Sequence, residues 1–88
     1  LVYAMSQSAE SLYPLLAAAL KHRLAVIRDH AFRDRDPAGH LKALQEASEA
    51  IVALQNQLPP NADPHLRHYL TQCSYDKALA FVEAAMQN

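Results

Sequence analysis

Glycine and cysteine are almost absent from this sequence, which has one of each among 88 residues and no tryptophan. The single glycine, Gly39, excludes a glycine-rich phosphate-binding loop. The single cysteine, Cys73, can form neither an internal disulfide nor a paired-cysteine zinc site, and we therefore expect a reducing, cytoplasmic location. No apolar run approaches the roughly 20 residues that a membrane-spanning helix needs, so no membrane partner is expected.

Charges of the two signs are nearly balanced, because eight lysines and arginines stand against nine aspartates and glutamates. A nucleic-acid-binding surface needs a surplus of basic residues to displace counterions, so no nucleic-acid partner is expected. Hydrophobic residues make up 51% of the chain, but many of them are alanines, which have little side-chain surface to bury. A domain of this length hides only about 60% of its chain surface, so its core should gain from a partner.

Helix starts are the clearest signals in the sequence. The pairs Asp36-Pro37 and Asp63-Pro64 each place a capping carboxylate before a proline whose backbone angle suits the first helical turn. Ser11 is the expected cap of an earlier helix. Strand-like alternation of apolar and polar residues is missing, so helices are the only regular structure expected.

The predicted fold class is all-α. The expected helices cover residues 11–32, 37–58 and 64–87. The loops between them have only about four residues, so neighbouring helices must be antiparallel. We predict an up-down-up three-helix bundle over residues 11–88, which dimerisation would complete. Residues 1–10 are expected to be an N-terminal arm, or in part a remnant of cloning ahead of Met5.

The first two expected helices each carry a single apolar stripe at spacings of three and four, which is typical of a core face. The stripes are Leu12, Leu16, Leu20, Leu24, Ile27 and Ala31 on the first helix, and Leu44, Ala47, Ile51, Leu54 and Leu58 on the second. Leu15 lies on the flank of the first stripe, and Leu41 and Val52 lie on a flank of the second.

The last expected helix has two apolar stripes on nearly opposite sides. One consists of Leu66, Leu70, Cys73, Phe81 and Ala84 or Ala85, and the other of Tyr75, Leu79, Val82 and Met86. Only one side can face the other helices, so the second stripe would be exposed in a monomer and mark an association surface.

This exposed stripe leads to the predicted function. We expect a non-enzymatic interaction module that forms a homodimer through the partner-binding residues Tyr75, Leu79, Val82 and Met86. The alternative is a small chaperone or adaptor whose stripe accepts an amphipathic helix of a protein partner. In layout the chain is similar to the small helical chaperones of flagellar and secretion substrates.

A break near Ser74 is the alternative for the last helix, because each half could then bury its own stripe in one core. The stretch that begins at Leu66 resembles one tetratricopeptide unit, with Tyr69 in its first helix and Tyr75, Ala78, Val82 and Ala85 at the spacings of its second. The resemblance implies two short helices. The stretch lacks the family's Trp-x-x-Leu-Gly positions, and the sequence has no second repeat against which it could pack.

Five histidines raise the question of metal or phosphoryl chemistry: His22, His30, His40, His65 and His68. His65 and His68 could share a metal ion, but the remaining ligands would have to come from elsewhere. His40, with Lys42 nearby, could carry a phosphoryl group. In the antiparallel layout these histidines do not converge, and Cys73 is expected to be a small core residue. We predict no metal, no cofactor and no catalytic residue, with a histidine-based metal-binding or phosphorelay domain as a remote alternative.

Overall fold

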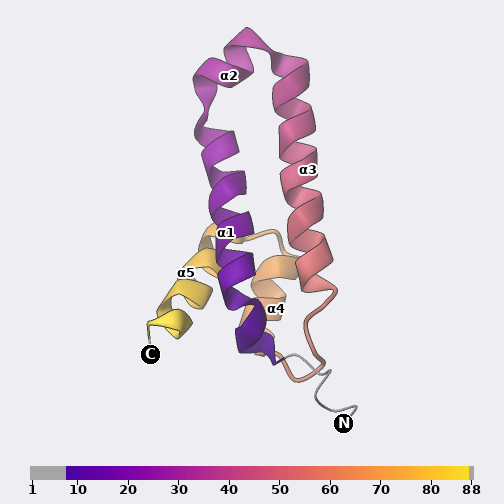
Figure 1. Ribbon diagram of the computed structural model, residues 1–88, viewed down its shortest axis with the longest axis vertical. Helices are drawn as coiled ribbons and strands as arrows, with labels where there is room; N and C mark the ends of the chain where they lie inside the picture. The colour runs from indigo at the N-terminus through magenta and orange to yellow at the C-terminus, as the bar shows by residue number, and fades with distance from the viewer. Residues whose placement is uncertain (1–7, 88) are drawn as a thin grey trace.

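The computed structural model describes residues 8–87, and this part of the chain is all-helical with no strand (Figure 1). The helices are α1 (Ala9–Arg28), α2 (His30–Arg35), α3 (Pro37–Gln55), α4 (Pro64–Thr71) and α5 (Tyr75–Met86). The predicted all-α class is confirmed, but a bundle of three nearly equal helices is not. The predicted arm over residues 1–10 lies outside the described residues except for its last three positions. None of the five helices combines the length and the apolar character that a membrane crossing requires.

Aspartate side chains cap the two later helix starts as predicted. The Gly39 N–H donates to Asp36 Oδ1 at 3.0 Å, and the His65 N–H donates to Asp63 Oδ1 at 2.8 Å. Each bond satisfies one of the backbone donors that the first turn of a helix leaves without an internal partner. The Asp-Pro pairs therefore mark the starts of α3 and α4.

The first helix begins earlier and ends earlier than the predicted range of 11–32. Ser8 is its N-cap, and the Ser8 hydroxyl accepts the Ser11 N–H at 3.3 Å. At the other end, Asp29 interrupts the helix and its carboxylate accepts the Phe32 N–H at 3.1 Å. A short polar side chain can bind nearby backbone donors in this way and so compete with helix continuation. The remainder of the predicted helix becomes the short α2.

α1 and α3 form a long antiparallel hairpin with α2 at its tip, and α4 and α5 pack at the opposite end (Figure 1). The molecule is elongated, with extents of 51 × 25 × 21 Å. The largest fully buried side chains are Leu12, Leu16, Leu20, Ile51, Leu66, Leu70 and Val82. They come from α1, α3, α4 and α5, so the core lies at the end where these helices meet. The rest of the hairpin, residues 23–48, is called the arm below and is a different segment from the predicted N-terminal arm of residues 1–10.

The predicted continuous helix over 64–87 is wrong, because the chain turns between α4 and α5. Cys73 has a φ of 56°, in the left-handed region. The Ser74 N–H donates to the Tyr69 carbonyl at 2.8 Å, and the Cys73 N–H donates to the Leu70 carbonyl at 3.1 Å. This pair of bonds around a left-handed residue is the Schellman pattern that ends helices. The alternative prediction, a break near Ser74, is confirmed.

The turn changes the role of both apolar stripes of this segment. Leu66 and Leu70 of α4 and Val82 of α5 are all buried in the same core. Cys73 lies at the turn and is exposed, so its predicted place in a core stripe is wrong. One chain by itself therefore buries most of the two apolar stripes, one of which was predicted to need a partner.

Candidate functional site

The four residues predicted to bind a partner do not share an exposed face. Val82 is fully buried and Tyr75 is nearly so, Leu79 is partly buried, and only Met86 is exposed. The physical reason is the turn at Cys73, which directs this stripe of α5 toward α1. These side chains therefore stabilise the fold of a single chain and do not form an association surface.

Arg23 lies where the covered part of the hairpin ends. Its Nε donates to Ser48 Oγ at 2.8 Å, and its guanidinium carbon lies 4.9 Å from the centroid of the Tyr75 ring. Tyr75 is the first residue of α5, so Arg23 connects α1, α3 and α5. A planar guanidinium can stack on an aromatic ring and still donate in its own plane, which suits such a junction.

An open groove begins at Arg23 and lies between α1 and α3 in the arm. Its volume is about 560 Å³, and its lining is Arg23, Leu41, Leu44, Gln45, Ser48 and Glu49. Ile27 lies one helical turn beyond Arg23 on the same face of α1. The six lining residues are called the arm groove below, and Ile27 is the exposed apolar residue of α1 one turn beyond it.

The arm groove continues the core face of α1 beyond its cover. Leu20 is fully buried, whereas Ile27, two helical turns further along the same face, is 39% exposed. Across the groove, Leu41 is 57% exposed. Neither α4 nor α5 extends over this half of the hairpin (Figure 1). The spacing of apolar residues predicted Ile27 in a core stripe and Leu41 on a flank. It gave no indication that no other helix would cover these two side chains.

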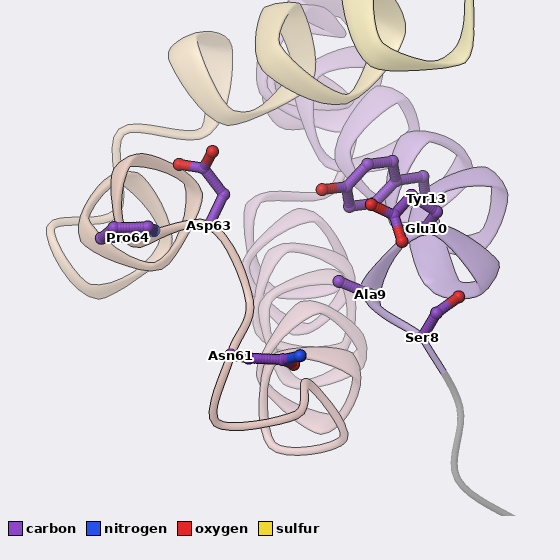
Figure 2. Close-up of a pocket in the computed structure, with 7 residues that line it drawn as sticks. All are labelled: Ser8, Ala9, Glu10, Tyr13, Asn61, Asp63 and Pro64. Atoms are coloured by element: carbon purple, nitrogen blue, oxygen red, sulfur yellow. The ribbon is translucent and has the colours of Figure 1, made fainter.

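A second hollow lies at the other end of the molecule, where α1 and α4 begin (Figure 2). Its volume is about 370 Å³, and its lining is Ser8, Ala9, Glu10, Tyr13, Asn61, Asp63 and Pro64. Tyr13 packs edge-on against Phe81, with ring centroids 6.2 Å apart. Burial, followed by the charges of Glu10 and Asp63, raises the pKa of Tyr13.

Alkaline pH should destabilise the protein through Tyr13. Because the pKa of Tyr13 is raised above its ordinary value of 10.0, the unfolded chain releases this proton at a lower pH than the folded chain does. The free energy of unfolding should therefore keep its full contribution from this group below about pH 10 and lose it as the pH rises further. Urea unfolding at stepwise pH should show a steeper alkaline fall for the wild type than for Tyr13→Phe. Equal slopes would contradict the raised pKa.

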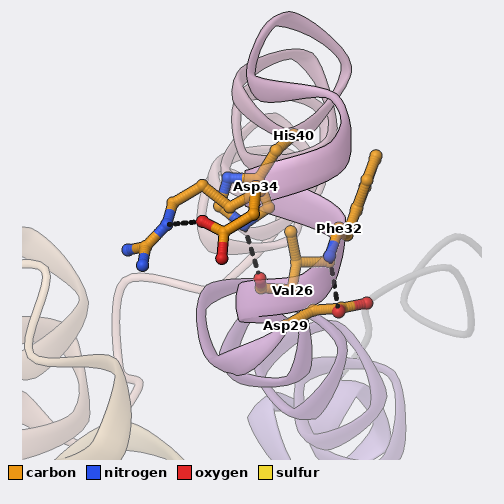
Figure 3. Close-up of polar contacts among 6 residues, drawn as sticks. Val26, Asp29, Phe32, Asp34 and His40 are labelled. Atoms are coloured by element: carbon orange, nitrogen blue, oxygen red, sulfur yellow. Dashed lines mark hydrogen bonds and ion pairs between the residues drawn. The ribbon is translucent and has the colours of Figure 1, made fainter.

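His40, the candidate phosphoryl carrier, is part of the packing at the tip of the hairpin. Its ring is buried, and Nε2 lies 2.7 Å from the Val26 carbonyl oxygen (Figure 3). The Phe32 ring packs edge-on against it, with centroids 5.4 Å apart. The Val26 carbonyl lies in the last turn of α1 and also accepts the Asp29 N–H at 3.2 Å. The ring joins α3 to the end of α1 and is not displayed to solvent.

The other histidines are exposed and lie on different parts of the molecule. His65 and His68 both lie on α4, and His65 Nδ1 is 3.2 Å from Asp63 Oδ1, the oxygen that caps this helix. Among residues 8–87, no three histidine, cysteine, aspartate or glutamate side chains are placed to hold one metal ion.

Comparison of the chain with protein-family models, curated protein sequences and solved structures gives no match.

Proposed function

We propose that this protein is a non-enzymatic helical module that acts through protein contacts, and that its partner is a second copy of the chain bound at the arm groove. The observation that supports this most directly is the uncovered core face of α1, where Ile27 is exposed although Leu20 is fully buried. An exposed apolar groove with polar residues beside it is typical of an association surface.

A permanent neighbour would suit the arm better than a transient one. Within residues 23–48, only Val26, His40 and Ala47 are buried. Helices in water depend more on the packing of their apolar face than on their own propensity, so a two-helix arm with so small a core is weak by itself. A second copy is present wherever the chain is made, which favours self-association over an unrelated partner.

The shape of the chain limits how two copies can pair. Because α4 and α5 cover one end of the hairpin, a second copy reaches the arm groove most easily when its tip points the opposite way (Figure 1). Twofold symmetry then places groove against groove and gives four antiparallel helices. Ile27 and Leu41 of both copies would lie in the shared core, with Gln45 and Glu49 at its polar rim.

The proposal includes neither catalysis nor a cofactor, and it places the module in the cytoplasm. The exposed thiol of Cys73 has no disulfide partner, which suits a reducing compartment. The histidines that suggested metal or relay chemistry are separate, and His40 is engaged in the tip.

Light scattering coupled to size exclusion tests the dimer. The wild type should have about twice the 9.8 kDa mass of one chain. Replacing both Ile27 and Leu41 by lysine should give a folded protein of single mass, because both side chains are already partly exposed in one chain and two charges per copy would face each other in the groove. A matched control replaces Leu15 and Val52, exposed apolar residues outside the groove, by lysine and should keep the wild-type mass.

Two results would overturn the dimer. A wild type of single mass at about millimolar concentration would exclude self-association and favour an amphipathic helix from another protein as the occupant of the groove. A groove variant that is folded by circular dichroism and keeps double mass would show that the interface lies elsewhere.

A further inference from the structure

Three polar residues of α3 follow the outer edge of the arm groove. Lys42, Gln45 and Glu49 are spaced by three and four positions, so they lie along one side of the helix. All three are exposed, and Gln45 and Glu49 belong to the lining of the groove. The basic residue stands in the first half of α3 and the acidic one in the second half. The edge of the groove therefore carries opposite charges at its two ends.

The two charges are not neutralised within one chain. Among residues 8–87, none of the ion pairs includes Lys42 or Glu49. Seven positions separate these two residues on α3, which is roughly 10 Å along the helix axis. Both charges are therefore available to a second molecule that lies along the groove.

Twofold pairing of two grooves brings the opposite charges together. With groove against groove and the tips pointing opposite ways, α3 runs antiparallel to the same helix of the second copy. The groove is lined from Leu41 to Glu49 along α3, so an axis through its middle passes close to Gln45. Lys42 and Glu49 are centred between positions 45 and 46, within about 1 Å of the same level. Lys42 of each copy then lies opposite Glu49 of the partner subunit.

A parallel arrangement would place like charges together. Equivalent residues would face each other, with Lys42 beside Lys42 of the partner subunit and Glu49 beside Glu49 of the partner subunit. Like charges across an interface oppose association. The charge pattern of α3 therefore favours the antiparallel arrangement, independently of the shape of the chain.

We propose that two reciprocal Lys42–Glu49 ion pairs between copies determine the orientation of the dimer and its choice of partner. This inference rests on the dimer proposed above and names the contacts by which one copy recognises another. Exposed ion pairs add little affinity, so burial of the apolar groove residues Leu41 and Leu44 supplies most of it. The charges act mainly by excluding arrangements and partners that would place like charges together.

Charge reversal tests the pairing. Lys42→Glu turns both pairs into two facing carboxylates, and Glu49→Lys turns both into two facing ammonium groups. Each single variant should dimerise at least about tenfold more weakly than the wild type at low salt. The double variant Lys42→Glu/Glu49→Lys has opposite charges in both pairs again and should dimerise as the wild type does. Sedimentation equilibrium over a concentration series measures these dissociation constants.

A mixture of the two single variants should form mixed dimers. The Lys42→Glu chain has only acidic side chains at the two positions, and the Glu49→Lys chain has only basic ones, so both pairs are attractive in the mixed dimer alone. Native mass spectrometry with one variant ¹⁵N-labelled counts mixed and like dimers. An excess of mixed dimers is expected, and the proportions of random pairing would overturn the ion pairs.

Glu46→Lys is the matched control, because it changes the net charge of α3 as Glu49→Lys does. Glu46 is exposed but does not line the groove, so this variant should dimerise as the wild type does. At about 1 M salt, where charges are screened beyond about 3 Å, the single variants should approach the wild-type constant. Equal weakening by Glu46→Lys would mean that only net charge matters and would overturn the specific pairs.

The ion pairs and the arm groove can fail separately. Wild-type affinity in both single variants at low salt is the result expected of a parallel dimer or of an interface elsewhere, and it would overturn the ion pairs. If Ile27→Lys/Leu41→Lys still gives single mass in that case, the groove remains the interface. A wild type of single mass would remove both proposals.

Discussion

Replacing Val82 by lysine should leave the protein largely unfolded. Val82 has no exposed surface and lies in the core that α5 forms with α1. Transferring an unpaired ammonium group out of water costs several kcal/mol even after local relaxation. The whole free energy of unfolding of a domain of this size is about 4 to 13 kcal/mol. One substitution is therefore expected to remove most or all of the stability.

Circular dichroism and urea unfolding measure this effect. The matched control is Val52→Lys, the same change at a helical valine that is 45% exposed on α3; it should alter the free energy of unfolding by about 0.5 kcal/mol or less. If Val82→Lys is folded and as stable as this control, then Val82 faces solvent or a partner. That result would restore the continuous last helix expected from the sequence.

Replacing Leu16 by alanine should lower the free energy of unfolding by about 3 kcal/mol, whereas Leu15→Ala should lower it by less than about 1 kcal/mol. The two leucines are neighbours on α1, but Leu16 is 0% exposed and Leu15 is 56% exposed. Helix propensity favours alanine equally at both positions. The difference between the variants therefore isolates the lost burial of Leu16 and the cavity that its truncation leaves.

Urea unfolding of the two variants under identical conditions measures this difference. A gap of at least about 2 kcal/mol is expected. Two variants of equal stability would mean that α1 is rotated about its axis, so that Leu16 is no more buried than Leu15. Since the core stripe and the arm groove both depend on that rotation, this pair also tests the placement of the proposed association surface.

Helix starts were predictable because they depend on residues next to each other in the chain. Asp36 and Asp63 accept backbone N–H groups within three residues, so the capping interaction is complete before any tertiary contact forms. The buried stripe through Leu16 and Leu20 was predictable for a related reason. Helical spacing alone places such residues on one face.

The turn between α4 and α5 was not predictable with the same certainty. The helix end at Cys73 uses a left-handed residue, and glycine is the usual sequence signal for that conformation. A cysteine there gives no such signal and has an unfavourable backbone conformation. The structure keeps it because the turn lets Leu70, Tyr75 and Val82 reach one core. The free energy gained by that burial depends on contacts between residues that are far apart in the chain, so local sequence does not show it.

The arm groove could not be predicted for the same reason. Ile27 belongs to a stripe that a full-length third helix would have covered, and its exposure follows from the reversal of the chain at Cys73. The hollow beside Tyr13 depends on the starts of α1 and α4 lying near each other, although they are about 55 residues apart in the chain. Neither spacing nor composition reports such a contact.

By itself the sequence determined the all-helical class, the capped starts of α3 and α4, and the core face of α1, because each depends on backbone hydrogen bonds and side-chain spacing within a few residues. Only the tertiary structure decided which apolar faces are covered. Burial depends on where the chain turns back on itself, and the turn at Cys73 is stabilised by the core that it closes. That turn buries Val82, leaves Ile27 and Leu41 open, and so moves the proposed association surface from the last helix to the arm.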